Sequence, residues 1–146
     1  MTIRPARAGE EAELTELAIR SKGHWGHDAA FLERARPELT VRAEHLRRWI
    51  VRVAERDGAV AGFAAVDPAA RELEMLFVDP AAIGTGVGRA LLIDALTAAR
   101  MAGLEALLIE SDPDAEPFYR LHGAEPVGTR TSSSTGRELR LLRIST

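Results

Sequence analysis

Three glycines at alternating positions, Gly84, Gly86 and Gly88, form the most distinctive chemical pattern in this sequence of 146 residues. They stand between a predicted strand and a predicted helix. Glycine lets the backbone approach a bound group closely and adopt positive φ angles, and the free amides at a helix N-terminus attract anions. The pattern therefore predicts a loop that binds a phosphate or pyrophosphate. A tight turn that binds nothing is the simpler alternative.

Two widespread phosphate-binding motifs do not fit this loop. A Walker loop ends in Gly-Lys-Ser/Thr, whereas here Arg89 and Ala90 follow Gly88. A dinucleotide fingerprint requires G-x-G-x-x-G in the first strand–helix unit of a fold, whereas this loop reads G-x-G-x-G and follows a three-strand meander. Both of these nucleotide-binding classes are therefore disfavoured.

The elements that precede the glycine loop can be predicted from hydrophobic spacing and turn signals. Asp57-Gly58 joins two extended runs and indicates a hairpin, and the apolar alternation of the next strand is irregular, as in a β-bulge or in a strand buried on both faces. Polar Ser21–Asp28 interrupts the helical pattern, and Asp28 is a predicted N-cap. The predicted elements are an edge strand over 3–6, a helix over 10–20, a helical stretch from 28 to 48 that pauses at Pro37, and strands over 50–56, 60–66 and 72–78.

After the loop, the pattern predicts a helix that ends at Gly103, a strand over 107–110, a helix from Asp112 to His122 and strands over 125–130 and 138–144. The polar connection 129–136 is interpreted as a solvated turn. The fold class is α/β, with a mixed sheet of about seven strands flanked by about four helices. No repeat or long linker divides the chain, so residues 1–146 are expected to form a single domain.

Composition narrows the function classes. Acidic residues outnumber basic ones by 22 to 19, which disfavours a nucleic-acid-binding protein. The chain has no cysteine, which excludes disulfides, thiolate metal sites and a cysteine nucleophile. No apolar run is long enough to span a membrane or to form a signal peptide. These features are compatible with a cytoplasmic protein.

Two segments of this chain resemble the signatures of the GNAT superfamily of N-acetyltransferases. Leu73-Glu74-Met75-Leu76-Phe77-Val78-Asp79-Pro80 followed by Ile83-Gly84-Thr85-Gly86-Val87-Gly88 is similar to the central strand and loop of the family, with Ile83 in place of the usual Gln or Arg. Ala115-Glu116-Pro117-Phe118-Tyr119 with Gly123-Ala124 is similar to the second signature. The resemblance is strong from Leu73 to Ala124, and the order of elements extends it to the rest of the chain.

The resemblance implies that the chain uses acetyl-CoA as a cosubstrate and moves its acetyl group to a primary amine by direct transfer in a ternary complex. The acceptor would be a small molecule or an exposed amino group. The residues that would bind the coenzyme are Leu76, Phe77, Val78, Gly84, Thr85, Gly86, Val87, Gly88, Arg89, Asp114 and Phe118. A non-catalytic acyl-CoA-binding sensor is the alternative function, and a protein that uses the fold only for interaction is a third.

The same resemblance implies catalytic roles for three residues. Glu74 is the first candidate for the general base and Glu72 the second, because acidic residues at the matching place in relatives are proposed bases. Tyr119, the only tyrosine of the chain, is the candidate general acid, since an unperturbed phenol with a pKa near 10 stays protonated at pH 7. The structural alternatives are solvated strand carboxylates and an aromatic ring packed beside Phe118.

The segment between the first two helices is expected to form part of the acceptor site. Trp25 could form a wall of the pocket, and His24 or Asp28 could pair with a polar acceptor; alternatively Trp25 only caps the edge of the core. These side chains lack the spacing of a reliable metal site, so no metal is expected. The expected partners are a small amine but no nucleic acid and no membrane, and a homodimer is compatible with the family resemblance.

Overall fold

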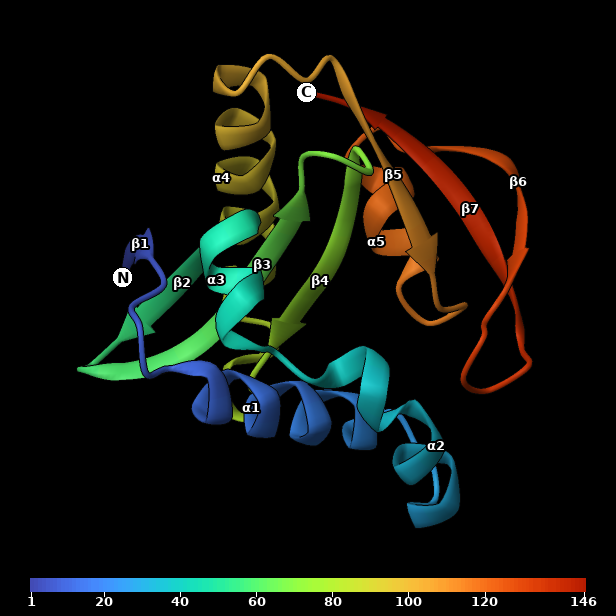
Figure 1. The fold of residues 1–146 in the computed structure, drawn as a ribbon, viewed down its shortest axis with the longest axis horizontal. Helices are drawn as coiled ribbons and strands as arrows, with labels where there is room; N and C mark the ends of the chain where they lie inside the picture. The colour runs from blue at the N-terminus through green and yellow to red at the C-terminus, as the bar shows by residue number, and fades with distance from the viewer.

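Seven strands form one mixed sheet in the computed structural model, which describes residues 1–146. Their order across the sheet is β1-β2-β3-β4-β5-β7-β6, and all neighbours are antiparallel except β4 and β5. Figure 1 shows the sheet with β1 and β6 at its edges. The strands are β1 (Thr2–Pro5), β2 (Ile50–Arg56), β3 (Ala59–Asp67), β4 (Glu72–Val78), β5 (Ala106–Ser111), β6 (Glu125–Thr131) and β7 (Glu138–Ser145).

Helices cover both faces of this sheet (Figure 1). On one face, α1 and α2 bury residues such as Leu14, Leu17 and Phe31 against Phe63 and Met75. On the other face, α4 and α5 pack against a second apolar cluster. The helices are α1 (Glu11–His24), α2 (Ala29–Leu39), α3 (Ala43–Arg48), α4 (Val87–Met101) and α5 (Glu116–Leu121), with a 3-10 turn η1 at Pro80–Ala82.

The predicted α/β fold is confirmed, with five α-helices instead of about four. The difference arises because the second helical stretch is two helices: α2 continues through Pro37, and the chain becomes extended at Thr40 before α3 begins. The predicted hairpin is also present, because Asp57 and Gly58 both have positive φ, 52° and 78°, as a type I′ turn requires.

Two predicted helix boundaries are wrong. The first helix does not stop at Ser21 but runs to His24, where Gly23 lets Leu32 of α2 pack closely, and Gly26 with φ 87° ends the turn. The helix predicted from Asp112 begins only at Glu116. The side chain of Asp112 caps nothing there, because Lys22 of α1 binds its carboxylate.

Gly62 allows α4 to lie close to the sheet. A Cβ atom at this position of β3 would stand 2.8 Å from the carbonyl oxygen of Phe77 and 2.9 Å from Cδ1 of Leu91. The helix presents Val87, Leu91 and other buried residues to this surface. Close packing here sets the position of the α4 N-terminus, which follows the glycine loop.

We expect Gly62→Ala to lower the free energy of unfolding by about 1–3 kcal/mol, because the added methyl group must displace α4 or the backbone of β4. Gly128→Ala is the matched control: it also lies in a strand, but an added Cβ there meets no atom within 4 Å. The control should change stability by less than about 0.5 kcal/mol. Urea denaturation of both variants tests this, and equal effects would contradict the packing role of Gly62.

Candidate functional site

The strands β4 and β5 separate at the centre of the sheet. Their parallel ladder contains one residue pair, Glu72 with Leu108, and the strands diverge beyond it (Figure 1). The carboxyl ends of both strands therefore face a gap instead of each other. In open α/β sheets, ligands bind at such carboxyl ends, so this gap is the first place to look for a site.

A β-bulge in β4 places Glu74 beside this gap. In the ladder with β3, Met75 pairs with Ala65 and Leu73 pairs with Val66, so Glu74 is the extra, unpaired residue. The bulge also reverses the side-chain alternation: Leu73 joins the cluster beneath α4, whereas Met75 joins the cluster beneath α1. Of the two explanations for the irregular apolar pattern of this strand, the bulge is confirmed, and both faces of the strand are also covered.

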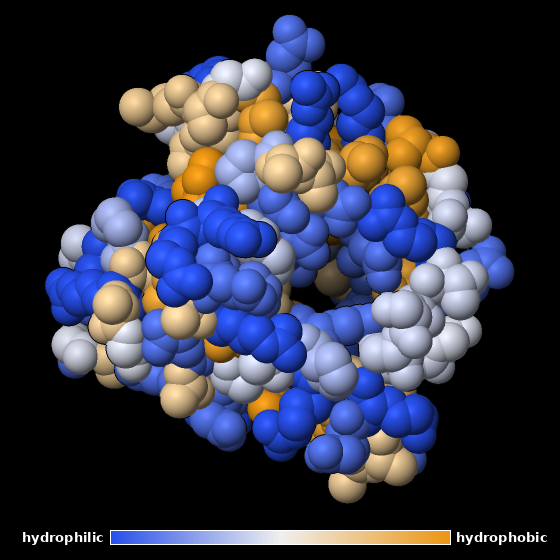
Figure 2. Space-filling model, viewed as in Figure 1, coloured by the Kyte–Doolittle hydropathy of each residue, from blue (hydrophilic) through white to orange (hydrophobic).

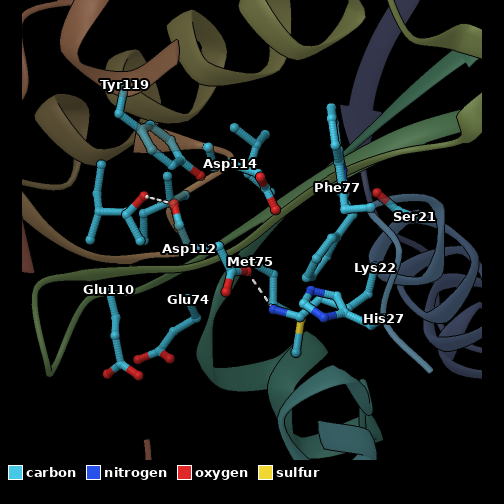
Figure 3. A pocket seen from close by; sticks show the side chains of 16 residues that line it. Ser21, Lys22, His27, Glu74, Met75, Phe77, Glu110, Asp112, Asp114 and Tyr119 are labelled. Carbon is cyan, nitrogen blue, oxygen red and sulfur yellow. Dashed lines mark hydrogen bonds and ion pairs between the residues drawn. The ribbon is translucent and has the colours of Figure 1, made fainter. Parts of the chain in front are cut away.

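The gap holds a central cavity of about 140 Å³, which Figure 3 shows from close by. Its walls come from β4, β5, the end of α1 and the segment before and within α5. Glu74 and Tyr119 both line it, together with Asp112 and Asp114. Side chains from four separate segments of the chain therefore converge on one small volume.

A groove of about 490 Å³ enters the central cavity from the side of the glycine loop. We call it the glycine-loop groove. It shares Leu76, Asp114 and Tyr119 with the central cavity. Its other lining residues include Val78, Ile83, Gly84, Gly86, Gly88, Arg89 and Phe118.

The glycine loop presents free backbone amides to this groove. Gly84 and Gly86 have φ angles of 81° and 88°, and neither amide donates to a protein acceptor. The first amides of α4 lack intrahelical partners because of helix geometry. Gly88 faces Val78 and Phe118, and a Cβ atom there would lie 3.4 Å and 3.8 Å from their side chains. The loop is therefore a cradle with the donors that an anion requires.

A third cavity, of about 460 Å³, opens from the opposite side of the sheet. We call it the acidic chamber. It shares Glu74, Glu110 and Asp112 with the central cavity. In Figure 2 this face of the molecule is hollowed, and the hollow is ringed largely by hydrophilic side chains. Its further lining residues include Glu38, Arg42, His45, Trp49, Glu72 and Arg130.

Glu74 differs from Glu72, Glu110 and Asp112 in the chamber because it has no cationic partner. Nη1 of Arg130 donates to Glu72 at 2.9 Å and to Glu110 at 3.4 Å. Burial, and to a smaller extent the charge of the neighbouring Glu72, raise the pKa of Glu74 to about 7. Although this side chain is exposed to the cavity, the cavity walls remove much of its hydration. Glu74 therefore exchanges a proton near neutral pH.

Tyr119 projects its hydroxyl group into the central cavity (Figure 3). The residue is 6% exposed, and its hydroxyl group makes no hydrogen bond within the protein. Burial raises the pKa of Tyr119 above its usual value, and the charge of Asp112 adds to this effect. The phenol thus keeps its proton and is free to donate it to a bound group.

Asp112 ties three segments together at the rim of the acidic chamber. Its Oδ2 accepts a hydrogen bond from Lys22, and its Oδ1 lies 3.1 Å from Nη1 of Arg137, without the alignment of a hydrogen bond. Arg137 also lies over the ring of Phe31, on which His27 stacks with a centroid distance of 4.1 Å. This cluster holds the connection between β6 and β7 against α1 and α2.

The same connection is anchored a second time. Ser132 is 3% exposed and donates a hydrogen bond of 2.8 Å to Glu38 of α2. The interpretation of residues 129–136 as a solvated turn is therefore wrong for Ser132. Together with Arg137, this contact holds in place the segment whose Thr131 and Ser133 line the acidic chamber.

The residues predicted to bind the coenzyme fall into two groups: those that line a cavity of the site and those that do not. Most of the predicted coenzyme-binding residues line the glycine-loop groove, and Phe77 lines the central cavity and the chamber instead. Thr85 donates both its amide and its hydroxyl group to Ala82, and Val87 is buried in the core, so of these two only Val87 can offer its backbone amide to the groove.

Of the three residues predicted for the acceptor pocket, only Trp25 lines a cavity of the site. Trp25 is 51% exposed and lines both the central cavity and the groove. Asp28 accepts a hydrogen bond from the amide of Phe31 and so caps α2. The His24 ring packs edge-on against Trp25, and neither His24 nor Asp28 lines the three cavities described here.

Several site residues were missed by the sequence analysis. Glu110 could have been recognised, because it is an acidic residue at the carboxyl end of a short apolar strand. The sequence carries no local signal for the other residues that were missed, because only the tertiary fold brings them to the site. These residues are Lys22, Glu38, Trp49 and Arg130. No group of three or more His, Asp or Glu side chains is arranged to hold a metal ion. No helix is both long enough and apolar enough to cross a membrane.

Comparison with known proteins identifies the fold and the family pattern. A family model described as an acetyltransferase (GNAT) domain matches residues 11–136. A GCN5-related N-acetyltransferase structure from Rhodopseudomonas palustris is 20% identical, with a TM-score of 0.84, and the match covers 99% of this chain and 95% of that one. At this identity the likeness shows the fold alone.

Two further structures give the same result. The PaiA N-acetyltransferase from Thermoplasma acidophilum, solved in complex with coenzyme A, is 18% identical with a TM-score of 0.78, over 99% of this chain and 98% of that one. A ribosomal-protein-alanine N-acetyltransferase from Brucella melitensis is 25% identical with a TM-score of 0.71, over 100% of both chains. No curated protein matches this chain significantly.

The raised pKa of Glu74 predicts a pH-dependent cost to folding. Between its ordinary pKa of 4.5 and the folded value of about 7, the unfolded chain is ionised at this residue and the folded chain is protonated. The contribution of Glu74 to stability therefore falls as pH rises through this window and stays low above it. Glu74→Gln should gain stability relative to the wild type as pH rises from 4.5 to 7.

Urea denaturation at a series of pH values measures this difference. Glu125→Gln, which removes an exposed carboxylate from β6, is the control and should follow the wild-type curve. A difference between Glu74→Gln and the wild type that stays constant with pH would contradict the description of this site.

Proposed function

The chain belongs to the GNAT family of acetyl-CoA-dependent acetyltransferases, and we propose that it acetylates a primary amine by direct transfer in a ternary complex. The observation that carries this proposal is the meeting of two cavities at one point: the glycine-loop groove and the acidic chamber join at the central cavity, between Glu74 and Tyr119. One reactant can enter from each side of the sheet and meet the other there.

The residues of the glycine-loop groove fit the coenzyme. The free amides of Gly84 and Gly86 and the first turn of α4 suit a pyrophosphate, and Arg89 lies at the same edge of the groove. A Cβ atom at Gly88 would make only ordinary van der Waals contacts with Val78 and Phe118, so the free amides of the loop, and not crowding at Gly88, support the coenzyme assignment. When bound, acetyl-CoA supplies an acetyl group activated as a thioester.

Leu76, Phe77, Val78, Asp114 and Phe118 are proposed to line the path of the coenzyme toward the central cavity, and Val87 to contribute its backbone amide. Both the amide and the hydroxyl group of Thr85 donate to Ala82, so Thr85 holds the shape of the loop. Beyond the pair Glu72–Leu108, β4 has no sheet partner on the side of β5. Its backbone amides there are available to polarise a carbonyl oxygen.

Glu74 is proposed to be the general base. An aliphatic amine with a pKa near 10.4 is almost entirely protonated at pH 7, so it must lose a proton before it can attack. A carboxylate with a pKa of about 7 is well matched to this task at neutral pH. Glu72, the second candidate, is less suitable because Arg130 binds its carboxylate at 2.9 Å.

Tyr119 is proposed to be the general acid. Glu74 takes one proton from the ammonium group before attack. As the C–N bond forms and the C–S bond breaks, the nitrogen releases a second proton and the leaving sulfur takes one from Tyr119, so the second proton restores the phenol. The Tyr119 hydroxyl group holds such a proton at the junction of the groove and the central cavity. The products are then an amide and a free thiol, and no covalent acetyl-enzyme is formed.

Replacing Glu74 with Gln tests the base. We expect kcat/KM at pH 7 to fall by about 10²-fold, in the range of general base catalysis. In the wild type, kcat/KM should rise with pH through an inflection near 7, and in Glu74→Gln this inflection should disappear. If the variant keeps the inflection, another group is the base.

Replacing Tyr119 with Phe tests the acid. We expect kcat to fall by about 10²-fold, while coenzyme affinity, measured by calorimetric titration, stays nearly unchanged. The fold should tolerate this change, because the hydroxyl group has no hydrogen-bond partner to lose. Unchanged turnover in Tyr119→Phe would exclude this residue as the acid.

A further inference from the structure

The acidic chamber carries more negative charge than its own cations neutralise. Five carboxylates line it, from Glu38, Glu72, Glu74, Glu110 and Asp112, against three basic side chains, from Lys22, Arg42 and Arg130. Lys22 is already bound to Asp112, and Arg130 is already bound to Glu72 and Glu110. Only Arg42, which is exposed, makes no ion pair in the chamber.

Two carboxylates remain without a cation. Glu74 has none, and Glu38 on α2 receives only a neutral donor, the hydroxyl group of Ser132, at 2.8 Å. Glu110 is near enough to Glu38 that the charge of Glu38 raises its pKa, although burial is the larger cause. Glu110 also lies near Glu74, whose pKa its charge helps to raise, so the negative region extends from Glu74 past Glu110 to Glu38.

The chamber wall beside Glu74, Glu110 and Glu38 is apolar and aromatic. Leu39, Met75, Phe77 and Leu139 line it, and Trp49 lies beside them. The ring of His45 stacks on Trp49 with a centroid distance of 4.0 Å, and burial lowers the pKa of His45, so this pair adds no charge near neutral pH. Methylene groups can pack on such a surface.

A metal ion does not fit this arrangement, because no three of the carboxylates converge on one point. An extended organic cation does fit. An independent observation shows which end of the chamber reacts: the hydroxyl group of Tyr119, in a side chain that is 6% exposed, points without a partner into the central cavity, which Glu74 also lines and Glu38 does not. The reacting amine therefore belongs at the Glu74 end.

We propose that the acceptor is an aliphatic diamine or polyamine. Its reacting amine lies at Glu74, its methylene chain packs on the wall of Met75 and Trp49, and its second ammonium group is held by Glu38 and Glu110. This proposal rests on the proposed acetyl transfer and names its substrate class. An acceptor with a carboxylate near its amine is disfavoured, because Lys22 and Arg130 are already paired.

The experiment compares three probes of the same chain length: putrescine with two ammonium groups, butylamine with one, and γ-aminobutyrate with one ammonium and one carboxylate. Calorimetry measures the binding of each probe, and release of free thiol from acetyl-CoA measures its turnover. We expect putrescine to bind about tenfold more tightly than butylamine, a difference of about 1.4 kcal/mol, and to have the higher kcat/KM. Both differences should shrink at high salt.

Glu38→Gln should reduce the preference for putrescine over butylamine by at least about threefold, because one carboxylate at the second ammonium is lost. Glu33→Gln is the matched control: it lies on the same helix, its side chain is 75% exposed, and it pairs only with Arg36 outside the chamber. The control should keep the wild-type preference.

The substrate class is overturned if putrescine and butylamine bind equally, if none of the probes binds, or if γ-aminobutyrate binds best, which would assign Arg42 to a carboxylate. Acetylation of butylamine at the rate of putrescine would overturn this inference alone and leave the proposed acetyl transfer intact. Tight putrescine binding without thiol release would support the chamber assignment and count against catalysis.

Discussion

The single residue pair between β4 and β5 is the constraint on which the rest of the structure depends. Parallel strands normally continue side by side, but here only Glu72 and Leu108 pair before the strands separate. The backbone of β4 beyond this pair is left without a neighbour, and the space between the strands connects one face of the sheet with the other. The bulge at Glu74 lies next to this opening and directs a carboxylate into it. The site has two entrances because β4 and β5 pair at only one residue of each strand.

The two sides of the site are held by different interactions. On the glycine-loop side, α4 is fixed by apolar packing against β3 and by the paired contacts of Arg52 with Asp94 at 2.7 and 3.2 Å. On the chamber side, the connection between β6 and β7 is held by polar contacts such as Ser132 with Glu38. A hydrogen bond to a charged group contributes about 1.5–3 kcal/mol, and a buried apolar side chain contributes a similar amount. The two sides of the site are therefore held by contacts of different kinds but similar strength.

Much of this organisation could be predicted from the sequence where the determining signals are local. The bounds of β2 and β4 agree with prediction because apolar runs end there at Asp57-Gly58 and Asp79-Pro80, and the glycine loop is recognisable from its spacing alone. The chamber was not predictable in this way. Arg130 is 58 residues from Glu72, Lys22 is 90 residues from Asp112, and Ser132 is 94 residues from Glu38. Asp112 shows how a distant contact can override a local signal. The sequence predicts that a helix begins at Asp112, but in the structure the distant Lys22 binds the Asp112 side chain.

Acetyl transfer is proposed to take place where the glycine-loop groove and the acidic chamber meet. The most direct measurement is the release of free thiol from acetyl-CoA by the wild-type protein with a panel of amines, beside a calorimetric titration of coenzyme alone. We expect micromolar coenzyme binding and thiol release that depends on the presence of an amine. Absence of coenzyme binding would contradict the assignment of Gly84–Gly88, and binding without turnover on any amine would favour an acyl-CoA sensor over an enzyme.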